Sequence, residues 1–205
     1  MWCEYRAGVS LLAMNVVIRR AEERDVPQML ALVKELAVFE RAPDEVTVTE
    51  AHMRDGGFGA DPVWVGWVAE VRSDNETIRR SENESAPSHP LTSRGSAKRS
   101  PSYGIVGMAV CYERYSTWKG RRLYLEDIIV TESARGQRIG EKLFMECVRY
   151  AVAQNHSGML WQVLDWNTDA IRFYDRFGAK YSSEWLNGSL ELEQLMKLNG
   201  GSGVI

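Results

Sequence analysis

A strand-like segment that runs straight into a glycine-bearing turn and a helix constrains the fold of this chain most. The segment "RLYLEDIIV" (122–130) has strand composition, and "ARGQRIGEKLF" (134–144) follows with two glycines and two arginines. Leu143, Cys147 and Ala151 then recur every four residues beside Tyr150, which is the spacing of one apolar helix face. A strand, a turn and an amphipathic helix in this order predict part of an α/β fold.

The turn ahead of this helix has two interpretations. It could be a surface turn with a glycine at a helix boundary. It could also bind an anion, because a helix start leaves backbone N–H groups unpaired and carries partial positive charge. Neither the GxxxxGK[ST] spacing of a P-loop nor the GxGxxG dinucleotide fingerprint is present.

The other periodic segments predict a single α/β domain over residues 14–205, in the order β-α-α-β-β-β-α-β-α-β. The remaining predicted strands are 15–19, 63–71, 105–115 and 159–164, with a final strand pairing between about Lys180 and Leu198. The predicted helices are 23–40, with Asp25 as N-cap, 49–55, stopped by Gly56 and Gly57, and 167–179, with Gly178 as C-cap.

Two segments are expected to lie outside the packed fold. Residues 1–13 precede the first strand-like run and are treated as an N-terminal extension. Residues 72–102 hold eight serines, three prolines and ten charges. Because such a segment buries too little apolar surface to offset its ordering entropy, we expect a mobile loop that joins two strands.

Composition excludes several function classes. A net charge of −3 lacks the basic balance that nucleic-acid binding needs, and no run approaches the roughly 18 apolar residues of a membrane span. The three histidines form no metal-ligand spacing, and the three cysteines form no CxxC pair. We therefore expect a cytoplasmic protein with reduced thiols and no metal.

The strand 122–130 also carries an unusual pair of charges. Glu126 and Asp127 are the only charged residues in "LYLEDIIV", and strand alternation predicts one carboxylate on each face. An unpaired buried carboxylate is costly. Either Arg121 or Arg122 neutralises them, or they lie in a cleft and act on a cationic substrate or a proton.

Motifs in this order resemble the Gcn5-related N-acetyltransferase (GNAT) superfamily, and within it the spermidine/spermine and thialysine acetyltransferases. "RGQRIG" (135–140) is similar to the family's Arg/Gln-x-x-Gly-x-Gly/Ala motif, with Arg138 in place of the first glycine. "VKELAVFE", "DGGFG", "YSTWKG" and "VLDWNTDAIRFY" resemble further segments of that subfamily. The resemblance implies a mixed, bent central sheet flanked by helices, usually in a homodimer, with acetyl-CoA as co-substrate.

The resemblance also implies which residues bind acetyl-CoA. The backbone of the turn would hold the pyrophosphate, the end of the strand would pair with the pantetheine arm, and the later helix would contact the cofactor further along. These positions are Arg135, Gly136, Gln137, Arg138, Ile139, Gly140 and Glu141; Ile128, Ile129 and Val130; and Asn167, Asp169, Ala170 and Tyr174.

The substrate is expected to be a primary amine of a small diamine, polyamine or lysine analogue. The resemblance makes Glu126 a general base through water and Asp127 and Glu40 the partners of a distal ammonium, with Phe39, Trp118 and Trp185 beside the amine. Ser116 is neutral where the polyamine enzymes typically carry an acidic residue, which favours a thialysine-like substrate. From periodicity alone Tyr174 could be a core aromatic, and packing also suits Trp185.

The chemistry requires three tasks. An alkylammonium with a pKa of about 10.4 must lose a proton, the thioester oxyanion needs donors, and the leaving thiolate needs an acid. Glu126, backbone amides of 122–130 and Tyr174 are the candidates. We expect direct transfer, because Cys111 and Cys147 have no histidine nearby in sequence. A non-catalytic acetyl-CoA-binding regulator and a protein-lysine acetyltransferase remain the alternatives.

Overall fold

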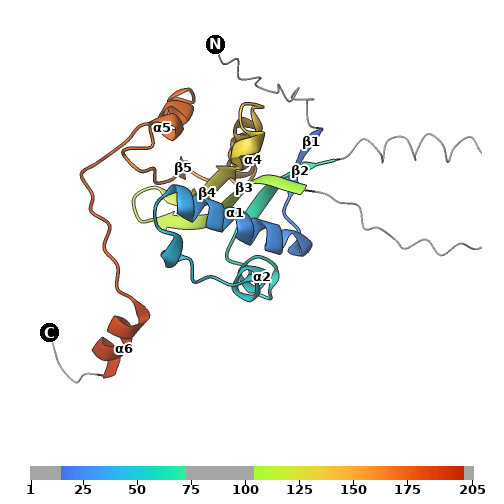
Figure 1. Ribbon diagram of the computed structural model, residues 1–205. Helices are drawn as coiled ribbons and strands as arrows, with labels where there is room; N and C mark the ends of the chain where they lie inside the picture. Colours follow the sequence, from blue (N-terminus) through green and yellow to red (C-terminus); the bar gives the residue numbers. More distant parts are fainter. Residues whose placement is uncertain (1–14, 73–103, 201–205) are drawn as a thin grey trace, which may run out of the picture. The chain divides into compact units, whose positions relative to one another are not determined.

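The computed structural model describes residues 15–72 and 104–200 (Figure 1). The chain divides into two compact units, Met1–Gln162 and Val163–Ile205. The predicted extension at 1–13 and nearly all of the predicted insert at 72–102 lie outside the described residues. The single domain predicted for 14–205 stays a prediction.

The first unit is built on a mixed five-stranded sheet with the order β1-β2-β3-β4-β5. Its antiparallel part comprises β1 (Val16–Arg20), β2 (Val65–Val71), β3 (Gly104–Ser116) and β4 (Gly120–Val130). The strand predicted at 159–164 is reduced to β5 (Met159–Leu160), which pairs in parallel with Leu123 and Tyr124. Among the described residues of this unit, β4 therefore has no strand beside it on that edge after Tyr124.

Helices cover both faces of this sheet. One core cluster joins α1 (Val26–Phe39) and α2 (Glu50–Phe58) to the sheet through Val68, Met108 and Ile129. On the opposite face lies α4 (Ile139–Ala153), since a Cβ at Gly107 would lie 3.3 Å from Leu143 of that helix. The helix face predicted from Leu143, Cys147 and Ala151 is buried, as expected.

The helix α2 continues through the two glycines that were predicted to stop it. It ends at Phe58, and Gly56 and Gly57 make room for the Trp64 ring. A Cβ at Gly57 would come within 2.2 Å of that ring, so the position excludes any side chain. These glycines serve close packing and not helix termination.

A buried ion-pair network fixes the start of α1. Arg19 on β1 donates two hydrogen bonds to Asp25, at 2.6 and 2.9 Å, and one to Glu70 on β2 at 2.9 Å. Asp25 is the N-cap residue, as predicted, but its side chain accepts from Arg19 and from the Glu22 N–H instead of capping α1. Burial alone would raise the pKa of Asp25, but the hydrogen bonds from Arg19 and Glu22 outweigh it and lower that pKa.

The described residues of the second unit form two helices, α5 (Thr168–Asp175) and α6 (Leu192–Gly200). The predicted helix 167–179 ends one turn earlier, and Gly178 follows with a φ of +76°. The strand pairing predicted between Lys180 and Leu198 is wrong, because the described residues there form no strand and end in α6. The sequence "LEQLMKLNG" has helix-forming composition, and Glu193 and Lys197 form an i,i+4 ion pair at 2.7 Å.

Candidate active site

A β-bulge in β4 places the two predicted carboxylates. Val110 of β3 pairs with Asp127, but the next residue, Cys111, pairs with Leu125, so Glu126 is an extra residue in the strand. The prediction of one carboxylate on each face is wrong because a bulge interrupts the alternation. Asp127 lies on the α1 side of the sheet, since its partner Val110 packs against the α1 core cluster.

Three carboxyl groups influence one another at this end of β4. Burial, the negative charge of Glu126 and that of Glu40 raise the pKa of Asp127 to about 6. Glu40 directly follows α1, and burial raises its pKa as well. A cation that enters this cluster would therefore be bound favourably.

The arginines that could have neutralised this cluster are engaged elsewhere. Arg121 pairs with Glu113 at 3.3 Å, and Arg122 donates to the Met159 carbonyl at 3.2 Å. Within the described residues, the Asp127 carboxylate has no ion pair and no hydrogen bond from a side chain. The interpretation as a purely structural ion pair is thereby excluded, and a cleft for a cation is favoured.

Two tyrosines and an arginine extend this face of the β3–β4 hairpin. Tyr112 pairs with Tyr124, and their ring centroids are 5.0 Å apart. Burial and the charge of Glu126 raise the pKa of both tyrosines. The guanidinium of Arg114 lies 5.8 Å from the Tyr124 ring centroid. The sequence alone did not identify Tyr112, Tyr124 or Arg114 as site residues. The short "STWKG" turn could have predicted which residues of the two hairpin strands pair.

The predicted anion-binding turn has the backbone that such a site requires. Gly136 has a φ of +80° with open space around the position of a Cβ. Arg138 adopts a left-handed conformation with a φ of 57°, so the arginine takes the conformation that a glycine would favour. It is the N-cap of α4 and its side chain makes no capping hydrogen bond. The Gln137 side-chain nitrogen is buried without a hydrogen-bond partner.

Phe39, at the end of α1, lies beside this turn. The Arg135 guanidinium lies 5.9 Å from the Phe39 ring centroid, and its Nε donates to the Val130 carbonyl at 3.0 Å. The Glu132 N–H donates to Glu35 of α1 at 3.3 Å. These contacts bring the end of α1, the end of β4 and the turn together. Trp118, at the tip of the hairpin, is 86% exposed.

The remaining predicted residues belong to the second unit. The Asn167 side chain caps α5 by accepting the Ala170 N–H at 3.2 Å, and Asp169 pairs with Arg172 at 3.3 Å. Tyr174 is buried, and its ring packs edge-on against Phe173. Trp185 is 77% exposed. Tyr174 and Glu126 thus lie in different units, and the roles predicted for these residues stay predictions.

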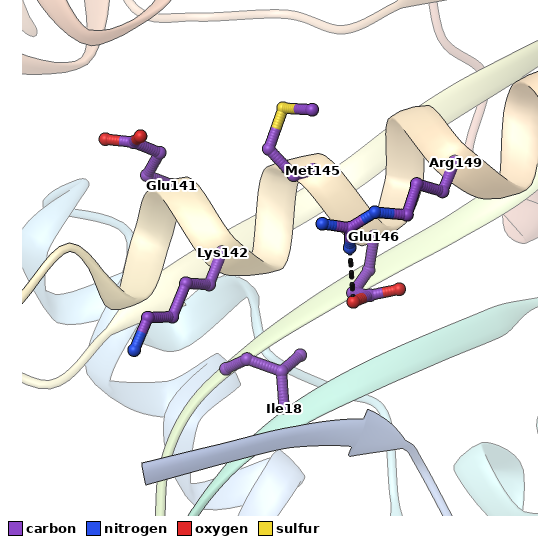
Figure 2. A pocket seen from close by; sticks show the side chains of 6 residues that line it. All are labelled: Ile18, Glu141, Lys142, Met145, Glu146 and Arg149. Atoms are coloured by element: carbon purple, nitrogen blue, oxygen red, sulfur yellow. Dashed lines mark hydrogen bonds and ion pairs between the residues drawn. The ribbon is translucent and has the colours of Figure 1, made fainter.

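Figure 2 shows the side chains that line a surface hollow between β1 and α4. The volume of this hollow is about 320 Å³. Ile18 forms one wall, and Glu141, Lys142, Met145, Glu146 and Arg149 form the other. Glu146 and Arg149 pair with each other along α4, on the same wall. Only Glu141 belongs to the predicted site, and its side chain lines this hollow. The hollow presents no cluster of carboxylates comparable to that at Asp127.

Neither a membrane crossing nor a metal site is found in the part of the chain that the structure describes. None of its helices combines the length and apolar character that a membrane crossing requires. No group of three or more His, Cys, Asp or Glu side chains there is arranged to hold a metal ion.

The comparisons with known proteins identify the class of this protein as an N-acetyltransferase. The chain belongs to the acetyltransferase (GNAT) family, whose profile matches residues 63–179. Over 188 residues it is 36% identical to thialysine N-epsilon-acetyltransferase of Bos taurus, which covers 90% of this chain and 98% of that protein. These findings confirm the family predicted from the motifs.

Two further proteins support the family and the fold. The chain is 33% identical over 162 residues to spermidine/spermine N(1)-acetyltransferase-like protein 1 of Homo sapiens, covering 79% of this chain and 20% of that protein. An integron cassette protein from the mobile metagenome of V. cholerae matches with a TM-score of 0.62 and 20% identity over 92% of this chain and 99% of that one. The predicted fold class is confirmed.

Proposed function

We propose that this chain transfers the acetyl group of acetyl-CoA to the primary amine of a small molecule, with a thialysine-like amino acid favoured over a polyamine. The observation that carries the proposal is the cluster of Glu40, Glu126 and Asp127, which no arginine neutralises within the described residues. The name of the bovine relative supports the substrate class, and that of the human relative keeps polyamines as candidates.

The carboxylates would bind and deprotonate the amine. In place of the distal ammonium that the resemblance assigned to them, Asp127 and Glu40 attract the reacting alkylammonium, whose arrival relieves the repulsion among the three carboxyl groups. Glu126 is exposed and projects from the bulge, so water reaches it. A proton can then pass from the ammonium through water to Glu126, which leaves a nucleophilic amine.

The turn before α4 would hold the diphosphate of coenzyme A. The unpaired N–H groups at a helix start, the open space at Gly136 and the partnerless Gln137 amide fit an anion with many acceptor oxygens. Bound acetyl-CoA supplies an activated acyl thioester. Residues 128–130 lie where β4 has no strand neighbour on the β5 side among the described residues, so their backbone can pair with an extended amide chain.

The remaining roles complete the proposed chemistry. Tyr174 would donate its hydroxyl proton to the leaving thiolate, while Asn167, Asp169 and Ala170 would contact the cofactor. Direct attack of the amine is favoured because Cys111 and Cys147 are fully buried. The neighbouring Cys147 thiol, together with burial, raises the pKa of Cys111. This thiol is therefore unsuited to carry the acetyl group.

The proposal includes a cytoplasmic homodimer. Free thiols at Cys111 and Cys147 suit a reducing compartment. Leu195 and Met196 are among several exposed apolar side chains of α6, which a second copy could cover. Light scattering on the purified chain tests the dimer, and a monomer at micromolar concentration would contradict it.

Release of free thiol from acetyl-CoA across a panel of amines tests the function. We expect a higher kcat/KM for thialysine or a short diamine than for spermine, because Ser116 adds no charge to the site. Its hydroxyl already accepts the N–H groups of Trp118 and Lys119 at 3.3 and 3.2 Å. Coenzyme binding without any turnover would favour a non-catalytic regulator. Turnover of lysine peptides alone would favour a protein-lysine acetyltransferase.

A further inference from the structure

Arg114 is a cation on the face of the hairpin that carries the proposed amine site. It lies on β3 two residues after Tyr112, so both side chains project from the same face. The position of its guanidinium over the Tyr124 ring confirms this side. No motif in the sequence had singled this residue out.

The face is polar along its length. The Arg114 guanidinium lies at one end, the Tyr112–Tyr124 ring pair occupies the middle, and Glu126 and Asp127 follow at the other end. Among the described residues, Arg114 makes no ion pair with a carboxylate, whereas its neighbour Arg121 pairs with Glu113 on the other face. The guanidinium is exposed and available to a ligand.

The spacing of these charges matches a particular kind of amine. The Arg114 guanidinium lies 5.8 Å from the Tyr124 ring centroid, and Tyr124 precedes Glu126 by two residues of β4, a separation of about 7 Å along the strand. A lysine analogue in extended form has about 7–8 Å between its side-chain nitrogen and its carboxylate carbon, from ordinary bond lengths. One molecule can therefore place its amine at Glu126 and its carboxylate at Arg114.

We propose that Arg114 is a specificity residue that binds the carboxylate of an amino-acid substrate while the side-chain amine reacts at Glu126. A guanidinium donates two parallel hydrogen bonds to a carboxylate, which fixes the substrate's direction. It repels the second ammonium of a diamine at the same place. This proposal rests on the proposed acetyl transfer and names the class of amine that the site selects.

Two substrates that differ only in the carboxylate test the proposal. Thialysine and its decarboxylated counterpart, 2-(2-aminoethylthio)ethylamine, are compared by kcat/KM on the wild type, Arg114→Ala and Arg114→Lys. Arg121→Ala is the matched control, since it removes a neighbouring arginine from the opposite face. We expect Arg114→Ala to lower the thialysine-to-diamine ratio about tenfold, mainly through the KM of thialysine, which corresponds to about 1.4 kcal/mol.

The other variants and readouts separate selectivity from damage to the fold. Arg114→Lys should retain part of the preference, and Arg121→Ala should retain all of it. Acetyl-CoA affinity should be the same in all four proteins. An equal loss for both substrates, or an unchanged ratio, would overturn the role of Arg114. Failure of the wild type to acetylate any amine would instead overturn the proposed function. If Arg114→Ala does not fold, the ratio measured on Arg114→Lys and Arg114→Gln decides in the same way.

Discussion

Replacing Asp127 with asparagine should stabilise the folded protein near neutral pH while weakening its binding of the amine. The carboxyl group is largely buried beside Glu126 and Glu40, and no arginine approaches it in the described part of the chain. Asparagine has nearly the same shape and removes the charge. The change therefore relieves repulsion without leaving a cavity or breaking an ion pair.

The size of the effect follows from the pKa of Asp127. Its rise from the ordinary 3.8 to about 6 corresponds to about 3 kcal/mol. The folded protein binds this proton more tightly than the unfolded chain does. The group therefore favours folding below pH 3.8, and that contribution is lost as the pH rises through 6. Because solvent reaches part of the side chain, we expect Asp127→Asn to gain about 1–3 kcal/mol at pH 7.5.

Urea denaturation of both proteins between pH 4 and 8 measures this difference. The free energy of unfolding of Asp127→Asn should exceed that of the wild type at pH 7.5, and the gap should close towards pH 4. Asp44→Asn, at an exposed position, is the matched control and should show no such trend. A gap that is constant with pH, or a less stable Asp127→Asn at pH 7.5, would refute the reasoning.

Three further perturbations probe the remaining parts of the structure. Gly136→Asp should abolish coenzyme A binding in calorimetry, while Gly136→Asn, which shares the strain of a φ of +80°, should retain more of it; equal affinities would argue against a diphosphate there. Tyr174→Phe should keep that affinity but slow turnover by about 10²–10⁴-fold, and an unchanged kcat would leave it a packing residue. Asp25→Asn should lose about 3 kcal/mol of stability at pH 7, because it breaks a buried pair with Arg19. That loss should shrink as the pH falls below 3.8, since the stabilisation from the lowered pKa of Asp25 is complete above 3.8 and disappears as the pH falls through that lowered pKa. A loss that does not vary with pH would contradict the pairing.

Sequence patterns predicted the elements whose apolar residues recur regularly. The faces of α1 and α4 and the main strands were recoverable because burial imposes the helical and strand periods directly. The bulge at Glu126 was not, because a single extra residue leaves the composition of a strand unchanged. The prediction that Gly56 and Gly57 stop α2 failed for another reason. These glycines make room for Trp64, and that contact forms only after folding.

The candidate site also contains some residues that the sequence could predict and others that it could not. Glu126, Asp127 and the turn at 135–141 could be named because their residue types are unusual for their elements. Arg114 could not be named, since an arginine on a strand is unremarkable until its position over Tyr124 is known. The strand pairing expected between Lys180 and Leu198 failed because the end of this segment has helix-forming composition and forms α6.

Glu126 is the extra residue of the bulge, a position that no other residue of β4 occupies. In a regular strand, Leu125 and Asp127 would share a face, yet here Leu125 pairs with Cys111 and Asp127 with the adjacent Val110, so they face opposite sides. If Glu126 were deleted, Leu125 and Asp127 would become neighbours and alternate as they already do. The proposed base therefore corresponds to a one-residue insertion into an otherwise regular strand. Gaining or losing this residue would leave every other side chain of the sheet on its present face.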